Sequence, residues 1–204
     1  RTLSEIKPLT VFEKKIFDEI NFVRTSPMEY AKKLRERIPF FFFFIYRPLD
    51  RRPRQTREGA RGIENAISYL EKLSPSTPFQ YSLEATSAIQ EHLKNKIQYP
   101  SRWRELRERY GKYLKDPELI HIVEGEFYGY NIAADLVAYI LVSEGNPKSE
   151  FRNSIFDKEI KITGIGCQTD SRYGYKCHIM LATGISPEEN ISKMQSERTK
   201  VSSI

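Results

Sequence analysis

Residues 161–182 read KITGIGCQTDSRYGYKCHIMLA, and this stretch decides the fold. Apolar residues alternate with small or polar ones on both sides of Ser171-Arg172-Tyr173, which is typical of two strands joined by a turn. Cys167 and Cys177 are equally distant from Arg172, so a hairpin that turns there places them directly opposite one another. The stretch therefore predicts an antiparallel hairpin that two cysteines could clamp.

The cysteine pair is close enough for a disulfide in this hairpin. Opposed residues of an antiparallel pair have Cβ atoms roughly 4.5–5.5 Å apart, so modest twist would allow a bridge. A bridge across so short a loop would stabilise the fold by roughly 3 kcal/mol on the chain-entropy model. The alternative is a pair of reduced, buried cysteines in a cytosolic protein. The spacing supports proximity and leaves the redox state open.

Periodic apolar positions predict a series of helices before this hairpin. Ser26 precedes Pro27 as an N-cap before a proline at the first helical position, and Ser82 is placed to cap a later helix. A short basic helix that contains Trp103 is expected at 101–110, and 118–128 reads as irregular or strand-like. The main helical ranges are predicted at 10–24, 27–37, 62–73, 83–97 and 131–143.

The chain of 204 residues, with 39% hydrophobic residues, suits one globular domain with appendages. We expect an N-terminal extension at 1–9, one domain at 10–185 with a Phe/Arg-rich insertion near 38–58, and a polar tail at 186–204. No apolar run approaches the length of a membrane span, so no transmembrane segment is expected. The chain begins at Arg1 and shows no signal peptide, which leaves the compartment open.

The insertion combines aromatic and basic residues. Five consecutive phenylalanines would be an aggregation hazard on a bare surface, so we expect the protein's own helices or a partner to cover them. The arginines that follow are either a solvated surface or a contact for an acidic partner. No nucleic-acid-binding motif accompanies the charge, so nucleic acid is not expected. The candidate partner-binding residues are Phe40, Phe41, Phe42, Phe43, Phe44, Arg47, Arg51, Arg52 and Arg54.

Several blocks together resemble the CAP superfamily, the SCP-like domain of cysteine-rich secretory proteins, antigen 5 and pathogenesis-related proteins. Residues 21–31 resemble the first-helix pattern asparagine-x-x-arginine … proline-x-x-tyrosine-alanine. The other blocks lie at 83–92, at Gly125-Glu126-Phe127, where the family usually has glycine-glutamate-asparagine, at 145–157, and at 164–177. The resemblance implies an α+β fold, an α-β-α sandwich with a small antiparallel sheet between helices.

The resemblance also implies a cleft of two histidines and two acidic residues that can hold zinc. His92 matches the first histidine, Glu126 the first acid and Glu144 the second, although the register could choose Ser143 instead. The second histidine falls on Phe151, whose ring has no lone pair to donate. We therefore expect a degenerate cleft with no catalytic residue, no cofactor and no metal. If zinc did bind, His92 and Glu126 would hold it.

Structural roles compete with the cleft for these residues. His92 could be hydrogen-bonded on a buried helix seam, and Glu126 could be a buried carboxylate bonded to backbone or to His92. His178 alternates with the cysteine face of its strand, so we expect it at the surface or in a second layer.

The favoured function is a non-enzymatic protein-interaction or scaffold module in a larger assembly, with acidic protein surfaces as partners. The alternative is a secreted or peripheral protein that binds anionic lipid or sterol. A hydrolase that uses His92 and Glu126 as an acid/base pair comes third. The resemblance and the cysteine pair favour secretion, while having only two cysteines permits an intracellular assembly such as the cytoskeleton or a cilium.

Overall fold

The computed structural model describes residues 9–95, 121–144, 146 and 148–183. The extension before residue 9, the expected basic helix with Trp103 and the tail at 186–204 lie outside these residues. Within α4 (Leu83–Asn95) the backbone is described, but the side chain of His92 is not. The expectations for these parts therefore stay predictions.

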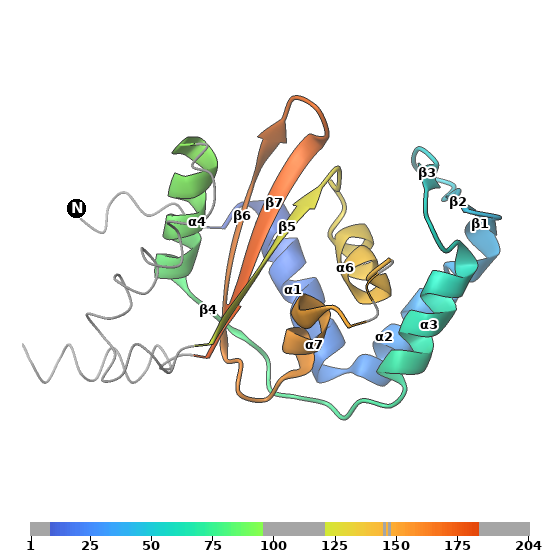
Figure 1. The fold of residues 1–204 in the computed structure, drawn as a ribbon, viewed down its shortest axis with the longest axis horizontal. Helices are drawn as coiled ribbons and strands as arrows, with labels where there is room; N and C mark the ends of the chain where they lie inside the picture. The colour runs from blue at the N-terminus through green and yellow to red at the C-terminus, as the bar shows by residue number, and fades with distance from the viewer. Residues whose placement is uncertain (1–8, 96–120, 145, 147, 184–204) are drawn as a thin grey trace, which may run out of the picture.

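The fold is α+β, and its main feature is a four-stranded sheet in the order β4-β6-β7-β5 (Figure 1). The three long strands are antiparallel, as expected, but β4 runs parallel to β6, so the sheet is mixed. The chain passes along the edge of β6 for only two residues before it enters α4, which accounts for this short parallel pairing. The strands are β4 (Gln80–Tyr81), β5 (Ile122–Tyr128), β6 (Ile162–Asp170) and β7 (Gly174–Ala182).

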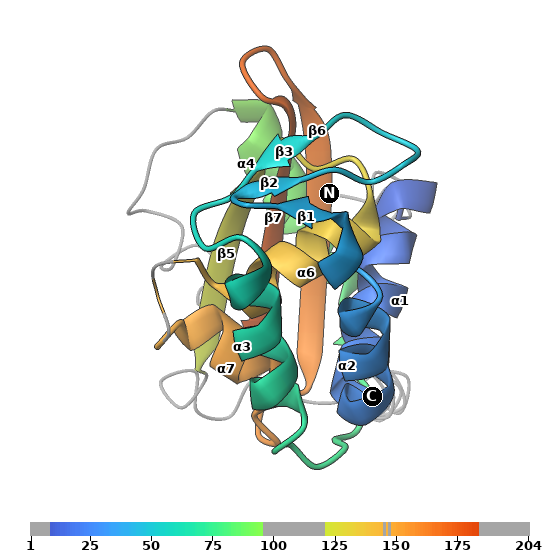
Figure 2. The ribbon, with the colours of Figure 1, turned by 90° about the vertical axis from the view of Figure 1, so that its right-hand side faces the viewer.

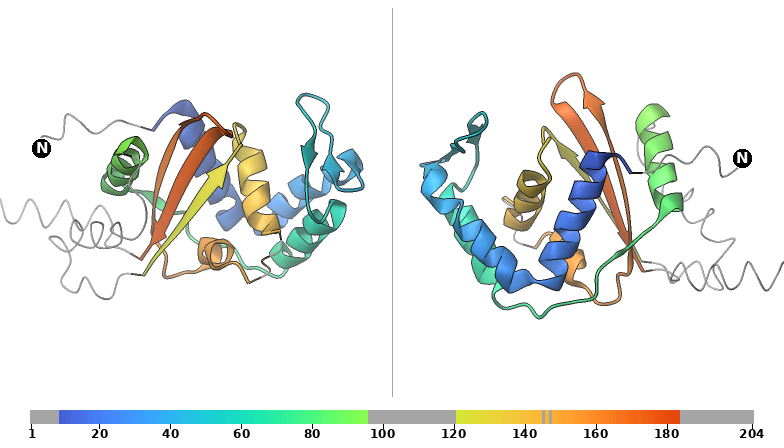
Figure 3. Two further views of the ribbon diagram at one scale, coloured as in Figure 1. Left: turned by 45° about the horizontal axis from the view of Figure 1, so that its top comes forward. Right: turned by 180° about the vertical axis from the view of Figure 1, so that it is seen from behind.

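Helices cover both faces of this sheet (Figures 1 and 3). On one face α4 packs on β6 and β7, while α1 and α7 pack on the other, and α6 packs against both of these helices. A further pair, α2 and α3, packs outside α1 and α6. The five predicted helices are confirmed, although the second ends earlier and the third begins earlier than expected. With α4, they are α1 (Val11–Thr25), α2 (Pro27–Arg35), α3 (Ala60–Leu70) and α6 (Ala133–Val142). One further helix, α7 (Glu150–Phe156), was not predicted from the sequence.

The Phe/Arg-rich insertion forms a second, smaller sheet that lies over α6 (Figure 2). A short 3-10 helix, η2 (Ile38–Phe40), leads into it, and its three strands are antiparallel. With two residues in each strand, such a sheet has little stability of its own and depends on what it packs against. The strands are β1 (Phe41–Phe42), β2 (Ile45–Tyr46) and β3 (Arg54–Gln55).

The register of the β6–β7 hairpin is the predicted one. Cys167 lies opposite Cys177, and their positions are compatible with a disulfide. Ile165 pairs with Ile179 on the same face, and both are fully buried in the core between the sheet and α1. The facing positions of the two cysteines therefore follow from the sequence, because both are equally distant from the turn.

Two glycines of β6 let α4 approach the other face of the sheet. A Cβ atom on Gly164 would lie 2.5 Å from the Cβ of Ala85, and one on Gly166 would lie 2.6 Å from Cγ2 of Ile89. Such distances are far inside van der Waals contact, so any larger residue would push the helix away. The pattern glycine-isoleucine-glycine thus gives one smooth face for α4 and one apolar face for the core.

Side chains complete the outer edge of β6 beyond its short pairing with β4. The amide of Ile165 donates to Oγ1 of Thr86 on α4 at 3.0 Å, and the amide of Cys167 donates to Oε1 of Glu13 on α1 at 2.7 Å. Glu13 is buried, and its other oxygen accepts the amide of Thr10 in a capping box at the start of α1. Both flanking helices are therefore joined to the strand edge, which is covered rather than open.

The buried side chain of Arg24 joins α1 to distant parts of the chain. Its guanidinium group stacks on the ring of Phe79, 4.1 Å from the centroid, and no part of the residue is exposed. Desolvation lowers the pKa of Arg24 to about 10, so the group remains a cation at neutral pH. Its nitrogens donate, over 2.5–2.9 Å, to the carbonyl oxygens of Thr77, Ile155, Asp157 and Ile160.

Asn21, one turn earlier, completes this junction. Its side-chain amide donates to the carbonyl of Phe79, and its side-chain oxygen accepts the backbone amide of Phe79. One side chain therefore satisfies both backbone hydrogen-bonding groups of Phe79. The asparagine-x-x-arginine pattern is thus a structural clamp. Ser26, by contrast, occupies the N-cap of α2 without making the expected side-chain bond, and Pro27 alone marks the helix start.

We predict that Arg24→Met will lower the free energy of unfolding by roughly 3 kcal/mol or more, because several buried carbonyls lose their donor. Urea denaturation of the purified chain measures this change. Arg35→Met is the matched control, since Arg35 forms an exposed ion pair with Glu71 and should lose less than about 1 kcal/mol. Equal losses in the two variants would contradict the role of Arg24.

We also predict that Cys167 and Cys177 are oxidised in the native protein. Alkylation of the unfolded, unreduced chain should then label neither cysteine, and labelling after reduction should reach both. Reduction, or the double change Cys167→Ser/Cys177→Ser, should cost about 2–4 kcal/mol of stability. Free thiols that react before reduction would show that the pair is a buried dithiol.

Candidate functional site

The structure does not bring the four expected cleft residues together. Glu126 lies on the face of β5 that points to the α4 side of the sheet, because it pairs with His178, while Gly125 and Phe127 take the opposite face. Phe151 lies on that opposite face, against Phe127. His92 belongs to α4, but its side chain is outside the described residues.

A continuous row of aromatic rings occupies the face on which Phe151 lies. The ring of Phe151 is 5.3 Å from that of Phe127, which is 6.5 Å from Tyr139, and Tyr139 is 5.1 Å from Tyr130. A Cβ on Gly125 would lie only 2.5 Å from the Phe127 ring, so glycine is needed for the ring to fold onto its own strand. These aromatic side chains offer packing and carry no imidazole or carboxylate.

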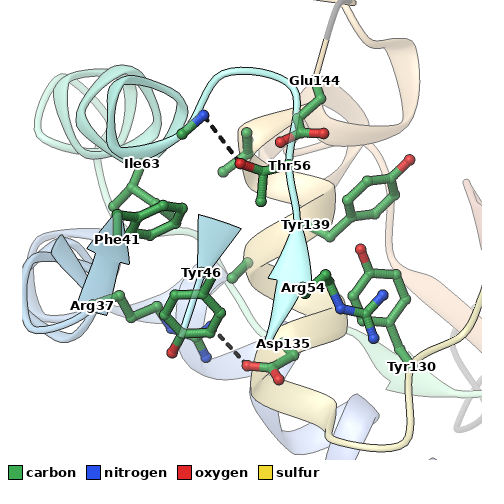
Figure 4. Close-up of a pocket in the computed structure, with 13 residues that line it drawn as sticks. Arg37, Phe41, Tyr46, Arg54, Thr56, Ile63, Tyr130, Asp135, Tyr139 and Glu144 are labelled. Atoms are coloured by element: carbon green, nitrogen blue, oxygen red, sulfur yellow. Dashed lines mark hydrogen bonds and ion pairs between the residues drawn. The ribbon is translucent and has the colours of Figure 1, made fainter. Parts of the chain in front are cut away.

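The row ends at a hollow of about 480 Å³, partly open to solvent, between the small sheet, α3 and α6 (Figure 4). Phe41 and Ile63 line one wall, and Tyr139 and Tyr130 line the other. Glu144 is at the rim, where Oε1 accepts the amide of Arg57 at 3.0 Å. Glu144 therefore helps to hold the insertion and lies well apart from Glu126, which is on the other face of the sheet.

Asp135 is the main anchor of the insertion. Its Oδ1 lies 2.7 Å from Nη1 of Arg37, and its Oδ2 lies 2.9 Å from Nε of Arg51, with all three side chains largely buried. Arg54 adds a second anchor, because its guanidinium lies 4.0 Å from the ring centroid of Tyr130 and donates to the carbonyl of Gly129. Figure 4 shows Arg54 beside Tyr130, and Asp135 beside Tyr46 and Arg37.

The arginines expected to bind a partner therefore divide into two groups. Arg51 and Arg54 turn inward and hold the insertion, which corrects the expectation that they form a contact surface. Arg47 and Arg52 are exposed, in the loop between β2 and β3. The guanidinium of Arg47 also lies 5.0 Å from the ring centroid of Phe42.

The phenylalanine run is likewise divided. Phe40 and Phe41 are half-buried against the helices, as expected. The next three, which we call the hairpin tip (Phe42, Phe43 and Phe44), are 56%, 78% and 55% exposed, so the protein's own helices do not cover them. The reason is geometric: the turn at Phe43 has a φ of 51°, and its backbone packs against Gly59 while the rings face outward.

A buried polar cluster lies on the α4 side of the sheet. His178 has no exposed side-chain area, which excludes the surface position and leaves the second of the two expected places, a buried layer, because β7 is an inner strand and α4 packs on it. Its Nε2 lies 3.3 Å from Oε1 of Glu124 and its Nδ1 lies 3.3 Å from Oε1 of Glu126. Glu126 also accepts the Tyr128 hydroxyl at 2.8 Å and lies 3.1 Å from the Lys176 ammonium.

This cluster favours the ionised form of Glu126. The hydrogen bond with His178 holds the pKa of Glu126 far below its ordinary value, burial opposes that shift, and the bonds from Tyr128 and Lys176 reinforce it. Burial alone would lower the pKa of Lys176, but the bond to Glu126 raises it above the ordinary value. The cluster is a network of charge-assisted bonds in which Glu126 is the shared acceptor.

Two important residues escaped the sequence-based expectations. Asp135 is the one acidic residue in the apolar range 131–143. A single carboxylate in a core helix needs a cationic partner, and the arginine-rich insertion offers several, so the sequence did contain a signal for this ion pair. His178 gave no such signal, because a period of two does not tell which face of an inner strand is covered.

Comparisons of the chain with protein-family models, with curated proteins and with solved structures give no match. Among the described residues, no group of three or more histidine, cysteine, aspartate and glutamate side chains is arranged to hold a metal ion. None of the helices in the described ranges is long and apolar enough to cross a membrane.

We predict that Glu126 makes the stability of the protein pH-dependent in the acid range. Its folded pKa lies below the unfolded value of about 4.3, so its ionised form stabilises the fold above that pH and the contribution is lost as the pH falls. Glu126→Gln should therefore flatten the decline in unfolding free energy between about pH 5 and about pH 3.

Urea denaturation at several pH values measures this slope. Glu29→Gln is the control, because Glu29 forms an exposed ion pair with Lys32. A slope that is the same in wild type, Glu126→Gln and Glu29→Gln would contradict the prediction.

Proposed function

We propose that this chain is an SCP-like domain of the CAP superfamily that acts as a non-enzymatic binding module. Its contact surface is the hairpin tip, held on the domain by buried ion pairs. The single observation that carries the proposal is the exposure of three consecutive phenylalanine rings on an anchored turn.

Several features support the family assignment. The asparagine-x-x-arginine block contacts two other parts of the resemblance. Asn21 binds Phe79, just before the block at 83–92, and Arg24 binds Ile155 and Asp157, within the block at 145–157. The glycines of β6 pack against the helix that follows Ser82. The layered α-β-α arrangement agrees with the fold that the resemblance implies.

The fold also suggests a revised register for one block. The family's glycine-glutamate-asparagine pattern fits Gly129-Tyr130-Asn131, which keeps the glycine and the asparagine, better than it fits Gly125-Glu126-Phe127. Tyr130 lies in the aromatic row that reaches Phe151, whereas Glu126 lies across the sheet. In this register an aromatic side chain replaces the acid as well as the histidine, which supports a cleft without acid/base chemistry.

The geometry of the insertion supports a binding role. Exposed contiguous aromatic surface on a soluble domain marks an interaction site. The small sheet cannot be stable alone, yet Asp135 pairs with two arginines and Tyr130 stacks with a third to hold it in place. A contact surface that is already ordered loses little entropy on binding, which favours affinity.

We predict that the chain is found in a complex in extracts of the cells that produce it, and that the hairpin tip is needed for this. The triple change Phe42→Ser/Phe43→Ser/Phe44→Ser should shift the chain to the free 23.9 kDa form, measured by size exclusion and by sedimentation. The single change Phe43→Ser should act in the same direction.

The matched control is Val11→Ser, because Val11 is 76% exposed and Phe43 is 78% exposed, and Val11 lies at the start of α1. This variant should fractionate like wild type. A wild-type chain that is entirely free and also absent from the membrane fraction, or a triple variant that remains in the complex, would contradict the proposed module.

A further inference from the structure

We infer that the partner of the hairpin tip is an anionic membrane surface, which the three rings enter while nearby arginines contact lipid headgroups. This inference rests on the proposed function, because it names the partner of the same contact surface. Four properties of the tip carry it: its shape, its chemistry, its backbone hydrogen bonds and the charge around it.

The shape of the tip suits a fluid partner. In the domain alone Phe43 is 78% exposed and its neighbours are more than half exposed, so the three rings project from the surface. The rings of Phe42 and Phe43 contact one another edge to face, 4.8 Å apart, and so form one convex apolar cluster. A protein partner would need a matching cavity, whereas acyl chains close around any apolar shape.

The chemistry of the tip also favours an apolar phase. Tyrosine and tryptophan carry polar groups that usually find hydrogen-bond partners when buried, whereas phenylalanine has none to satisfy in an apolar phase. The tip consists of phenyl rings alone, which cannot donate or accept such bonds. Each ring that enters the acyl region should strengthen binding by about tenfold or more.

The backbone on either side of Phe43 is hydrogen-bonded within the protein. Phe42 pairs with Ile45 across the hairpin, and the carbonyl of Phe44 accepts both the amide of Thr56 at 2.7 Å and its hydroxyl at 2.9 Å. Unsatisfied polar groups are what exclude irregular backbone from hydrocarbon. Because these bonds stay inside the protein, shallow insertion of the tip leaves them intact.

The charge around the tip selects a negative surface. Residues 37–61 contain seven arginines and two acidic residues, and Asp135 pairs with two of these arginines, so the insertion with its anchor carries a net charge of +4. Two copies of the chain that met through this segment would bring like charges together, so self-association is disfavoured. Each exposed arginine near an anionic bilayer should strengthen binding about fivefold, and Arg47, beside the Phe42 ring, lies next to the point of insertion.

The test uses the purified full chain and two kinds of vesicle, phosphatidylcholine alone and phosphatidylcholine mixed with phosphatidylserine. We expect cosedimentation with the mixed vesicles, little with the neutral ones, and weaker binding as salt rises. In Phe43→Trp, tryptophan emission should shift to the blue with mixed vesicles, and by more than in wild type, whose single tryptophan lies elsewhere in the sequence.

Two pairs of variants separate insertion from general attraction. Phe42→Ser/Phe43→Ser/Phe44→Ser should weaken binding by about tenfold for each inserted ring, about a thousandfold in all, and Val11→Ser should not weaken it. Arg47→Gln/Arg52→Gln should weaken it by about twentyfold. Arg172→Gln/Lys158→Gln removes the same charge from exposed positions outside the insertion and should have a smaller effect.

The outcomes distinguish the two proposals. Binding to mixed vesicles that needs both the rings and the nearby arginines supports the inference. Vesicle binding that is equal in the serine variant would show charge attraction alone and overturn it. No vesicle binding, together with a complex in cell extracts that still needs the tip, would leave the module in place with an acidic protein as partner and would also overturn the inference.

Discussion

The guanidinium group of Arg24 is the contact on which the rest of the structure depends. It binds carbonyl groups 53 residues away, before β4, and 131–136 residues away, from the last turn of α7 to the segment before β6. One buried cation therefore fixes the direction of α1 against two distant segments of the chain. Because α1 also supplies Glu13 to the edge of β6 and packs on α6, its position sets the sheet edge and the support for the small sheet.

Successive side chains of β5 point to opposite faces of the sheet, and this alternation separates its polar side chains from Phe127. Glu124 and Glu126 point to the α4 side and meet His178, while Gly125 and Phe127 point to the side of Phe151. A shift of one residue in a strand exchanges its faces, so residues that adjoin in the sequence serve different sites. The polar cluster and the aromatic row are consequently separate features, although Glu126 and Phe127 are neighbours in the chain.

The sequence was sufficient where the signal is local. The β6–β7 hairpin follows from a symmetric turn, and α1 and α6 follow from apolar periodicity. It was insufficient where the deciding partner is far along the chain. Nothing near residue 54 indicates that Arg54 stacks on Tyr130, or that Arg37 and Arg51 share Asp135 roughly 90 residues later. The expected grouping of Glu126 with Phe151 failed for a related reason: a motif match does not tell which face of a strand a residue takes, and these two side chains lie on opposite faces of the sheet.

The aromatic row and the anchoring of the hairpin tip are physically linked. Tyr130 is a member of the aromatic row and is also the ring on which Arg54 stacks. An acid in its place would attract the same arginine as an ion pair and would lose the apolar wall beside Tyr139. The aromatic side chain instead packs on both sides, so the row supports the small sheet while Asp135 binds its arginines. Within this arrangement, the exposed rings of Phe42, Phe43 and Phe44 lie on a small sheet that Asp135 and Tyr130 anchor to the domain.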